Sequence, residues 1–411
     1  MNSEWKEYKL GDLATKITKG TTPSTIGRTF TKKGIKFFRS ECLTESKYLD
    51  RSNLKFIDEF THNKMSRSKL CGKDILFSMA GMFLGKTCIV SDQDIPANIN
   101  QAVALIRLEN VDVNFIYYYL NQKRVVDYVN NCSSQSAQPN INLKQIGEIS
   151  INLPPLPAQK RIAEILSKLD DKIELNNKVN KNLEEIAQAI FKQWFVDFEF
   201  PDQNGNPYKS SGGKMIQSEL GDIPEEWSVK SLDDIAEYLN GLALQNFRPS
   251  GEKYIPVVKI KELKNGISES SEKASPDIDK NYIIHDGDVL FSWSGSLEVV
   301  IWCNGIGALN QHLFKVSSKK YNKWFYYLWT LFYLERFKHI AASKATTMGH
   351  IKRGELKKAK VIVPRNNDLS ILNELFDPII DKIIKNNIEA RTLTKTRDEL
   401  LPKLMCGEIR V

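Results

Sequence analysis

An internal repeat constrains the fold of this chain more than any other feature of its sequence. The segment Asp171–Asn177 returns as Asp381–Asn387, and Asn100-Gln101 returns as Asn310-Gln311, in both cases 210 residues later. Near the start of each copy the spacing is wider, because Glu4-Trp5 returns only after 222 residues. Repetition at a nearly constant spacing indicates two copies of one structural unit. The sequence therefore predicts two related globules, each followed by a helix.

Each globule is expected to mix short strands with helices. β-Rich runs at Asp74–Met79, Ala102–Leu108 and Glu148–Leu153 are bounded by Gly, Pro, Asn or Asp, which commonly end strands. Aromatic residues at helical spacing predict a short helix over Asn114–Val129. The predicted fold class is therefore α+β, with two mixed α/β globules joined by a long antiparallel two-helix coiled coil.

The coiled coil is predicted from two long segments in which seam residues recur at alternating steps of four and three. Both stripes are polar or small near the middle, so antiparallel pairing would place Asn176 near Asn386 or Ala390. Helices that merely cap their own globules are the alternative. The residues expected to pair are Ile162, Leu166, Leu169, Ile173, Asn176, Leu183 and Ile190 with Leu372, Phe376, Ile379, Ile383, Asn386, Leu393 and Leu400.

The repeat and the two helices together divide the chain into five predicted regions. These are a first globule (1–157), a central spacer helix (158–200), a linker (201–217), a second globule (218–367) and a C-terminal spacer helix (368–411). An antiparallel pair of helices of about 40 residues each would hold the globules roughly 60 Å apart. With approximate two-fold symmetry between its halves, such a chain would point both globules the same way and hold them at a fixed separation.

The formal net charge of +8 is unevenly distributed along the chain. Residues 1–157 carry +6 and residues 211–367 carry +4, whereas residues 158–210 and 368–411 carry −1 each. A basic excess confined to the two globules favours a polyanionic partner there, although solvated surface would give the same charge count.

The motifs that could carry catalysis are each better interpreted as structure. Ala80–Thr87 fits a relaxed phosphate-binding loop, but no helix pattern follows it, so a hairpin turn is predicted. Pro276–Lys280 is expected to be a solvated loop rather than a nuclease site, and His312 is expected to be structural. The five histidines lack ligand spacing, so neither a metal nor a cofactor is expected.

Cellular location is also addressed by the sequence. The six cysteines show no CxxC spacing, which favours reduced, structural cysteine. The first residues are charged and lack the apolar core of a secretory signal, and no apolar run reaches the roughly 18 residues of a membrane span. A cytoplasmic protein with no membrane partner is expected.

Candidate DNA-binding residues cluster where the two copies differ most. In the first globule, cations surround the small, hydroxylated run Gly20–Ser24, which suits contact with phosphates. Divergence between the copies at this place is typical of two surfaces that read different bases, while solvation is the alternative for any single cation. The candidates are Lys19, Thr21, Thr22, Ser24, Arg28, Lys32, Lys33, Lys36, Arg39, Gln245, Asn246, Arg248, Lys259 and Lys261.

Three stretches of the chain resemble the DNA-specificity subunits of type I restriction-modification enzymes. They are Leu153–Ile173, beginning Leu-Pro-Pro-Leu-Pro-Ala-Gln-Lys-Arg-Ile, then Phe191–Phe198, and finally Leu400–Ile409, where the family often has Ser in place of Cys406. Leu220–Trp227 is similar to the family's entrance into its second recognition domain. Together with the repeat, the resemblance covers the whole chain.

The resemblance implies a non-catalytic subunit that recognises double-stranded DNA. Each globule would read one half of a split target, and the paired helices would set the spacer. The helices would also dock two modification (methyltransferase) subunits, which methylate adenine, and restriction subunits, which are ATP-dependent translocases and nucleases. Docking is expected at Phe191, Trp194, Phe195 and Phe198, with packing in the chain's own core as the alternative.

Two other functions compete with this interpretation. A self-sufficient methyltransferase or nuclease of the restriction type would act without partners. A coiled-coil scaffold with basic globules would bind nucleic acid without sequence preference.

Overall fold

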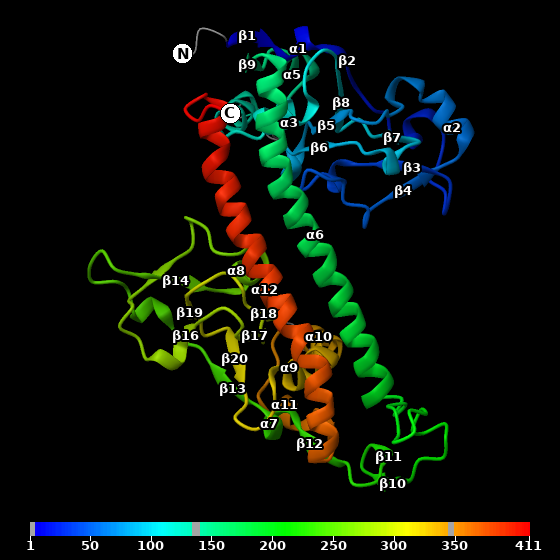
Figure 1. Ribbon diagram of the computed structural model, residues 1–411, viewed down its shortest axis with the longest axis vertical. Helices are drawn as coiled ribbons and strands as arrows, with labels where there is room; N and C mark the ends of the chain where they lie inside the picture. Colours follow the sequence, from blue (N-terminus) through cyan, green and yellow to red (C-terminus); the bar gives the residue numbers. More distant parts are fainter. Residues whose placement is uncertain (1–4, 134–139, 344–348) are drawn as a thin grey trace. The chain divides into compact units, whose positions relative to one another are not determined.

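The computed structural model describes residues 5–133, 140–343 and 349–411 (Figure 1). The chain divides into two compact units, one formed by Met1–Glu174 with Thr392–Val411 and the other by Leu175–Arg391. Each unit thus contains one globule and a part of both long helices. The five regions predicted from the sequence remain a prediction about domains, because the compact units cut across both helices.

The described residues of the first unit form three small sheets. The largest is antiparallel, in the order β2 (Ala14–Lys19), β8 (Val103–Leu108), β5 (Ile75–Ser78) and β6 (Thr87–Ile89). The second has the order β4 (Lys55–Ile57), β3 (Ile35–Phe38) and β7 (Ala97–Ile99), with β3 and β7 parallel. The third joins β1 (Lys6–Lys9) to β9 (Ser150–Leu153).

Helices and single 3-10 turns connect these strands. The helices are α1 (Leu10–Leu13), α2 (Glu59–Lys64), α3 (Val113–Leu120), α4 (Lys123–Ser133), α5 (Leu143–Gly147) and the long α6 (Leu156–Phe195). The 3-10 turns are η1 (Pro23–Ile26), η2 (Ser40–Cys42), η3 (Ser66–Ser68), η4 (Gly81–Phe83) and η5 (Asp92–Asp94).

The four-stranded sheet of the first unit is buried on both faces. Phe77 and Ile106 point into one apolar cluster, which also holds Phe115 of α3 and Leu166 of α6. Neighbouring strand residues such as Leu105 alternate to the other face, where a second cluster joins this sheet to β3 and β7. Burial on both faces explains why these strands are continuously apolar.

The predicted secondary structure of the first globule is confirmed except at one helix. The runs at 74–79, 102–108 and 148–153 form β5, β8 and β9. The helix predicted over 114–129 is instead two helices, α3 and α4, with a break at Asn121-Gln122. The Asn121 side chain donates to the Tyr117 carbonyl at 2.7 Å and to the Thr87 hydroxyl at 2.6 Å, so it closes the end of α3 and ties it to β6.

The second unit repeats this topology. Its antiparallel sheet has the order β13 (Glu237–Asn240), β20 (Leu313–Ser317), β17 (Val289–Ser292) and β18 (Val299–Ile301). The next sheet has the order β15 (Lys273–Ala274), β14 (Ile255–Val258), β19 (Gly307–Leu309) and β16 (Ile283–Ile284), again with one parallel pair, β14 and β19. The remaining strands pair as β12 (Ser228–Ser231) with β21 (Lys360–Val363) and β10 (Met215–Ser218) with β11 (Gly221–Pro224).

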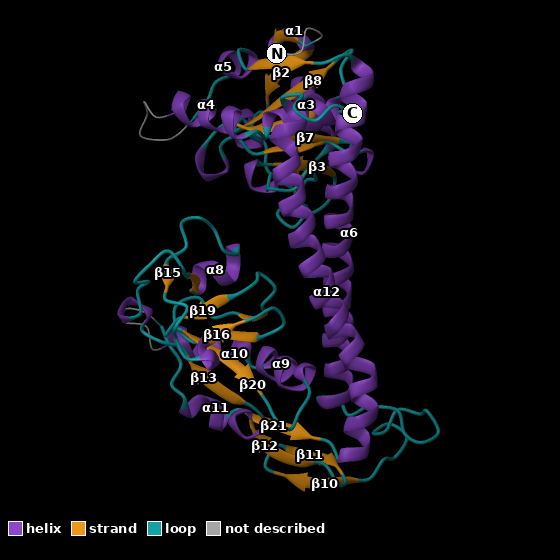
Figure 2. Ribbon diagram, turned by 60° about the vertical axis from the view of Figure 1, so that its left-hand side comes forward, coloured by secondary structure: helices purple, strands orange, loops and turns teal. Residues whose placement is uncertain are grey.

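The helices of the second unit follow the order of the first except that α8 precedes β15, whereas α2 follows β4. They are α7 (Leu232–Ile235), α8 (Ile260–Asn265), α9 (Lys323–Phe332), α10 (Leu334–Ser343), α11 (Gly354–Lys358) and the long α12 (Asn366–Met405), with 3-10 turns η6 (Leu244–Asn246) and η7 (Lys280–Tyr282). Both four-stranded antiparallel sheets have the same strand order, and in each unit the described chain then continues through three short helices and one strand into a long helix, so the internal repeat predicted from the sequence is confirmed. Figure 2 shows the mixture of helices and strands in both units.

Within the second unit, α6 and α12 pair antiparallel through buried asparagines. The Asn176 side chain donates to the Asn386 carbonyl at 3.4 Å and to a carboxylate oxygen of Glu389 at 2.9 Å. Asn180 donates to the Ile383 carbonyl at 3.2 Å and accepts from the Asn386 side chain at 2.8 Å. Such bonds require one alignment of the helices, which agrees with the predicted position of Asn176 beside Asn386.

Within the first unit, the same two helices meet around a buried ion pair. Arg397 of α12 contacts Asp170 of α6 at 2.8 Å, and the Tyr118 hydroxyl donates to the same carboxylate at 2.6 Å. Toward the start of α6, Ile162 and Leu166 lie in one apolar cluster with Leu404 of α12. The seam is therefore polar in its middle part and apolar beyond it, as the sequence predicts.

The buried stripe departs from the predicted heptad positions at Ile379 in α12 and at Ile190 in α6. In α12 the buried residue is Ile380, whereas the predicted Ile379 is only partly buried. In α6 burial follows Ala187 and Phe191, and the predicted Ile190 lies at the edge of the core. A straight α-helix drifts relative to a 3.5-residue repeat, and here the globule covers the face toward which the stripe drifts. Each long helix therefore both covers a globule and pairs with the other long helix.

The state of the cysteines agrees with the reduced thiols expected from the sequence. All six cysteines are free, and burial raises the pKa of the Cys88 thiol to about 12. No helix in the described part of the chain combines the length and apolar character that a membrane span requires. The same residues contain no group of three or more His, Cys, Asp or Glu side chains placed to hold a metal ion.

Candidate nucleic-acid interface

A glycine closes the first strand of the large sheet in the first unit. Gly20 follows β2, and its amide donates to the Val103 carbonyl, while the Thr21 amide donates to the Ile99 carbonyl at 3.2 Å. A Cβ atom at position 20 would lie 1.8 Å from the Ile99 oxygen, so only glycine fits. The backbone therefore packs directly against the turn Asn100-Gln101, and the Thr22 hydroxyl donates to the Gln101 side chain.

The second unit builds the same turn with Gly241. The Gly241 amide donates to the Leu313 carbonyl and the Leu242 amide to the Leu309 carbonyl, both at 3.0 Å. A Cβ atom on Gly241 would lie 2.2 Å from the Asn310 oxygen. We refer to Asn100-Gln101 and Asn310-Gln311, each packed against its glycine, as the Asn-Gln turns. The loop that follows each glycine therefore starts from a backbone position packed against an Asn-Gln turn.

In the first unit, the loop after Gly20 is held by charged contacts to α2 and η3. Arg28 forms an ion pair with Asp58 at 2.8 Å, and its Nε donates to the Thr61 hydroxyl at 3.2 Å. Hydrogen bonds from Thr61, together with Arg28, lower the pKa of the Asp58 carboxyl. Arg67 donates to the Thr21 hydroxyl at 3.0 Å. Thr21 and Arg28 thus belong to one hydrogen-bonded surface.

An exposed aromatic ring completes this surface. Phe60 of α2 is 55% exposed, with the guanidinium of Arg28 4.9 Å and the ammonium of Lys64 4.7 Å from its ring centre. An apolar ring kept in solvent between two cations is a feature that binding proteins use to contact nucleotides. Sequence reasoning missed Phe60 and Arg67, because they lie outside the cationic run and only the fold brings them to it.

The remaining candidates of the first globule differ in their freedom to reach a ligand. Ser24 is exposed in η1, and Lys19, Lys32 and Lys33 are exposed without an ion-pair partner among the described residues. By contrast, Lys36 of β3 donates to the Gln93 carbonyl at 2.6 Å. Arg39 lies 3.3 Å from Glu41, and its Nε is buried. The three exposed lysines are therefore accessible to a ligand, whereas contacts within the fold hold Lys36 and Arg39.

In the second unit, the candidates gather around one acidic residue. Glu272 pairs with Lys259 and with Arg248, the latter at 3.4 Å, and these cations lower the pKa of its carboxyl, Lys259 most strongly. The Lys261 side chain donates to the Ser270 hydroxyl at 3.1 Å. The predicted Gln245 and Asn246 are exposed in η6, directly after the Asn-Gln turn contact of Leu242.

A cluster of aromatic and imidazole rings borders the Asn-Gln turn of the second unit. The Trp293 indole donates to the Asn240 side chain at 2.9 Å, and its ring lies 5.9 Å from that of His312. Nδ1 of His312 is 3.0 Å from the Ser294 hydroxyl, in agreement with a structural histidine. The equivalent first-unit positions of Trp293 and His312 are Met79 and Ala102. The two globules therefore share a backbone framework and differ in the side chains on it.

The motifs that resemble catalytic sites have structural explanations. Ala80–Thr87 spans the hairpin between β5 and β6, so the turn predicted there is confirmed and no helix follows to face a phosphate. Residues 276–279 lie in the loop before η7, and Lys280 is the first residue of η7. These places therefore lack the geometry that nucleotide binding or metal-dependent cleavage requires.

The aromatic residues at the end of α6 lie mostly in the chain's own core. Phe191, Phe195 and Phe198 are buried, and the Phe191 ring lies 4.9 Å from that of Trp329. The alternative interpretation, internal packing, is therefore what the structure shows for these three residues. Trp194 is only partly buried, so its docking role remains a prediction.

An apolar groove of 390 Å³ lies beside these aromatics, between the end of α6 and α9. Its lining includes Val196, Leu328 and Phe332, and the last of these is 46% exposed. This groove is a better docking candidate than the buried rings.

Known proteins resemble the chain in sequence and in fold. The family model described as "Type I restriction modification DNA specificity domain" matches it twice, over residues 2–185 and 224–399. A "Type I restriction enzyme MjaIX specificity subunit" from Methanocaldococcus jannaschii is 28% identical, covering 99% of this chain and 94% of its own. The HindI specificity subunit from Haemophilus influenzae is 24% identical over 99% of this chain and 100% of its own.

One solved structure supports the fold. The crystal structure of a type I restriction-modification system S subunit from M. genitalium superimposes with a TM-score of 0.59 at 14% identity. The superposition covers 98% of this chain and 97% of that one.

Proposed function

The chain belongs to the family of type I restriction-modification DNA specificity subunits, and we propose that each of its globules recognises one half of a two-part DNA target. As a member of this family it is a non-catalytic DNA-recognition subunit. The half-site assignment goes further, because it gives each globule a separate sequence to read.

The proposal depends on one observation: the two globules share the same backbone framework but carry different side chains on it. Gly20 and Gly241 pack against equivalent Asn-Gln turns, so the loops that follow them start from the same backbone position. Those loops carry Thr21 and Arg28 in one globule and Gln245 and Arg248 in the other. A common scaffold with different polar side chains on its loops is what two readers of different base sequences require.

The helices α6 and α12 are proposed to set the spacer between the half-sites. The hydrogen bonds of Asn176, Asn180 and Asn386 allow one alignment, because a shift by a turn would leave buried amides without partners. A fixed alignment gives the spacer a fixed length. Partner subunits are proposed to supply the chemistry: modification subunits methylate adenine, and restriction subunits translocate and cleave DNA.

Docking of a modification subunit is proposed at the apolar groove between α6 and α9. Phe332 and Val196 expose apolar surface there. Trp194 lines the separate pocket around Trp227 and packs against Phe376, so it does not contribute to this groove. Exposed apolar surface in a groove is typical of a protein interface.

Competition binding at fixed salt tests sequence recognition directly. We expect one duplex from a randomised library to bind at least about 10³-fold more tightly than unrelated duplexes, because base contacts add to the phosphate contacts. The two conserved halves of the selected duplexes should be separated by positions without preference. Equal affinity for all duplexes would instead support the scaffold alternative, and methyl transfer by the isolated chain would support a self-sufficient enzyme.

Lengthening both helices together tests the spacer proposal. One heptad inserted in α6 after Asn180 and one in α12 before Ile383 adds about 10 Å of helix, or about three base pairs of B-DNA. We expect the selected spacer to change in length while both half-sites stay the same. The matched control inserts a heptad in α6 alone, which should destroy the asparagine contacts and the cooperative unfolding transition. Altered half-sites with an unchanged spacer would contradict the proposal.

A further inference from the structure

The short helix α2 presents an apolar ring to solvent although the helix itself is firmly anchored. Its inner side is fixed, because Thr61 is fully buried and the Asn98 side chain donates to the Met65 carbonyl at 3.0 Å. Phe60 and Lys64 are four residues apart and both exposed, so they are neighbours on the outer face of the helix. Phe60 belongs to none of the apolar clusters formed by the described residues.

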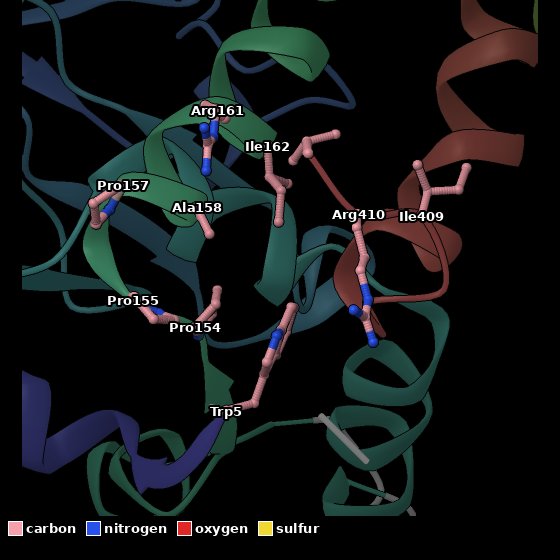
Figure 3. A pocket seen from close by; sticks show the side chains of 11 residues that line it. Trp5, Pro154, Pro155, Pro157, Ala158, Arg161, Ile162, Ile409 and Arg410 are labelled. Atoms are coloured by element: carbon pink, nitrogen blue, oxygen red, sulfur yellow. The ribbon is translucent and has the colours of Figure 1, made fainter. Parts of the chain in front are cut away.

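Trp5, just before β1, shows how the same unit covers an aromatic ring with its own chain. Its ring centre lies 6.4 Å from that of Phe115. Figure 3 shows Trp5 beside Ile409 and Arg410, which belong to the segment after α12. The Phe60 ring has no comparable apolar cover among the described residues, and charged side chains lie over it instead.

These charged side chains hold the Phe60 ring in position. The guanidinium of Arg28 lies 4.9 Å and the ammonium of Lys64 lies 4.7 Å from the ring centre. Arg28 is fixed in turn by its ion pair with Asp58 at 2.8 Å. The Asp58 side chain also caps α2, because it accepts a hydrogen bond from the Thr61 amide at 2.6 Å. The ring is thus preorganised, so less conformational entropy is lost when a ligand contacts it.

The surroundings of the ring favour a polyanionic ligand. The loop before β3 lies against β4, since the Thr31 amide donates to the Phe56 carbonyl at 2.9 Å, and η3 contacts the loop after Gly20 through Arg67 and Thr21. The cations on these neighbouring segments are Arg28, Lys32, Lys33, Lys64 and Arg67, and the carboxylates are Asp58 and Glu59. An excess of cations beside an exposed ring suits the phosphates and bases of DNA.

The second unit exposes a different ring at a different place. Tyr254 directly precedes β14, is 49% exposed and has the Lys273 ammonium 4.0 Å from its ring centre. β14 and β3 are equivalent, since each pairs in parallel with the strand that leads into an Asn-Gln turn. At the position of Tyr254 the first unit has Gly34. The two globules therefore differ in where they expose a ring and in whether it carries a hydroxyl group, which suits two half-sites of different sequence.

The chemistry of a phenyl ring restricts what Phe60 can read. The ring has no hydrogen-bond donor or acceptor, and the apolar group that the major groove displays is the C5-methyl of thymine. A helix with its side chains is about 10 Å wide, which the major groove of about 12 Å admits and the minor groove of about 6 Å does not. Full insertion between base pairs would need both faces of the ring, and two cations already lie over it. These points favour contact with a thymine methyl group.

We propose that Phe60 makes the first globule specific for a thymine, through contact between its ring and the C5-methyl group of that base in the major groove. Arg28 and Lys64 hold the ring in place for this contact. The inference rests on the proposed function, because it assigns one base contact within the half-site that the first globule reads. That half-site must then contain a thymine whose methyl group adds to the affinity.

Replacing thymine by uracil tests the contact directly, because it removes the methyl group and leaves base pairing unchanged. The probes are the duplex that the unchanged chain selects from the randomised library and copies of it in which each thymine in turn is replaced by uracil. At one position of one half-site, uracil should raise the dissociation constant of the unchanged chain about three- to fivefold, the contribution of one buried methyl group. Phe60→Ala should bind the thymine duplex about tenfold more weakly and should not distinguish thymine from uracil at that position.

Three comparisons separate the methyl contact from a general loss of structure. Phe60→Leu keeps an apolar side chain and should keep most of the preference for thymine over uracil. Met82→Ala is the matched control, since Met82 is an apolar side chain of the same unit that is 88% exposed, and it should bind like the unchanged chain. Phe60→Ala should retain its preference at the other half-site, which shows that the variant is folded.

The proposal is overturned if uracil weakens binding at no thymine, if the uracil effect survives in Phe60→Ala, or if Met82→Ala abolishes it as well. A rise in the fluorescence of 2-aminopurine placed beside the thymine, lost in Phe60→Ala, would show insertion between bases and would equally refute it. If the unchanged chain selects no duplex, the proposed function fails and this inference fails with it. Selection of a duplex without any uracil effect refutes this inference alone.

Discussion

Replacing Arg397 by methionine is expected to lower the free energy of unfolding of the first unit by about 3–5 kcal/mol. The Asp170 side chain is 7% exposed, and Arg397 provides its ion pair at 2.8 Å. Methionine would leave this carboxylate buried with the Tyr118 hydroxyl, at 2.6 Å, as its one remaining donor among the described residues. Removal of one partner of a buried pair costs far more than the pair contributes, because the remaining charge keeps its desolvation cost.

The protonation states support this expectation. Burial by itself lowers the pKa of Arg397, but hydrogen bonds and the charge of Asp170 outweigh it and raise the pKa above the usual arginine value. Burial and the Asp170 charge raise the pKa of the Tyr118 hydroxyl. Both groups therefore remain protonated donors at neutral and mildly alkaline pH, and the effect of the substitution should be the same at these two pH values.

Urea unfolding followed by circular dichroism measures this effect. Lys395→Met is the matched control, since Lys395 is on the same helix, is 79% exposed and should change the free energy by less than about 0.5 kcal/mol. Combining Arg397→Met with Asp170→Leu should recover much of the loss, because no unpaired charge then remains buried. Equal effects of the Arg397 and Lys395 substitutions would show that the pair does not stabilise the unit.

Adding one methyl group at Gly20 should remove recognition of one half-site only. The new Cβ atom would lie 1.8 Å from the Ile99 oxygen, a separation that no side chain adjustment can relieve, so the strand end must move. Because Thr21 and the cations follow directly, Gly20→Ala should weaken specific DNA binding by about 1–3 kcal/mol or more through the first half-site. Gly241→Ala should do the same at the second half-site, since its Cβ would lie 2.2 Å from the Asn310 oxygen.

Selection of duplexes from a randomised library shows which half-site each variant has lost. Controls exist in both units: a Cβ atom at Gly147 would meet only ordinary contacts from 3.8 Å, and one at Gly251 would meet nothing within 4 Å. Alanine at these positions should leave both half-sites intact. If Gly20→Ala weakened both half-sites equally, the assignment of one half-site to each globule would be wrong.

The architecture could be predicted from the sequence because the internal repeat and the helical seam both appear as regularly spaced residues. The recurrence of Asn100-Gln101 at the same spacing as the seam residues predicted two equivalent globules, and polar residues at Asn176 and Asn386 predicted where the helices align. The spacing of apolar residues can be recognised in the sequence because it reflects which face of a helix or strand is buried.

The details that the sequence did not reveal depend on contacts between distant segments. Gly20 and Gly241 were not recognised as equivalent, because the loops around them have diverged and only backbone packing relates them. Phe191 and Phe195 have the composition of a docking surface, and composition alone cannot distinguish an internal core from an interface. Phe60 joins the cationic loop only through the fold of α2.

The burial of Leu404 and Met405 in the first unit has a consequence for biosynthesis. These residues lie in the same apolar cluster as Phe77, Phe115 and Leu166, which are synthesised more than two hundred residues earlier. At about 5–20 residues per second, the ribosome needs roughly 10–50 s to cover that distance. The first globule to emerge is therefore the last to be completed, and the nascent chain must carry an open apolar surface until the end of α12 arrives.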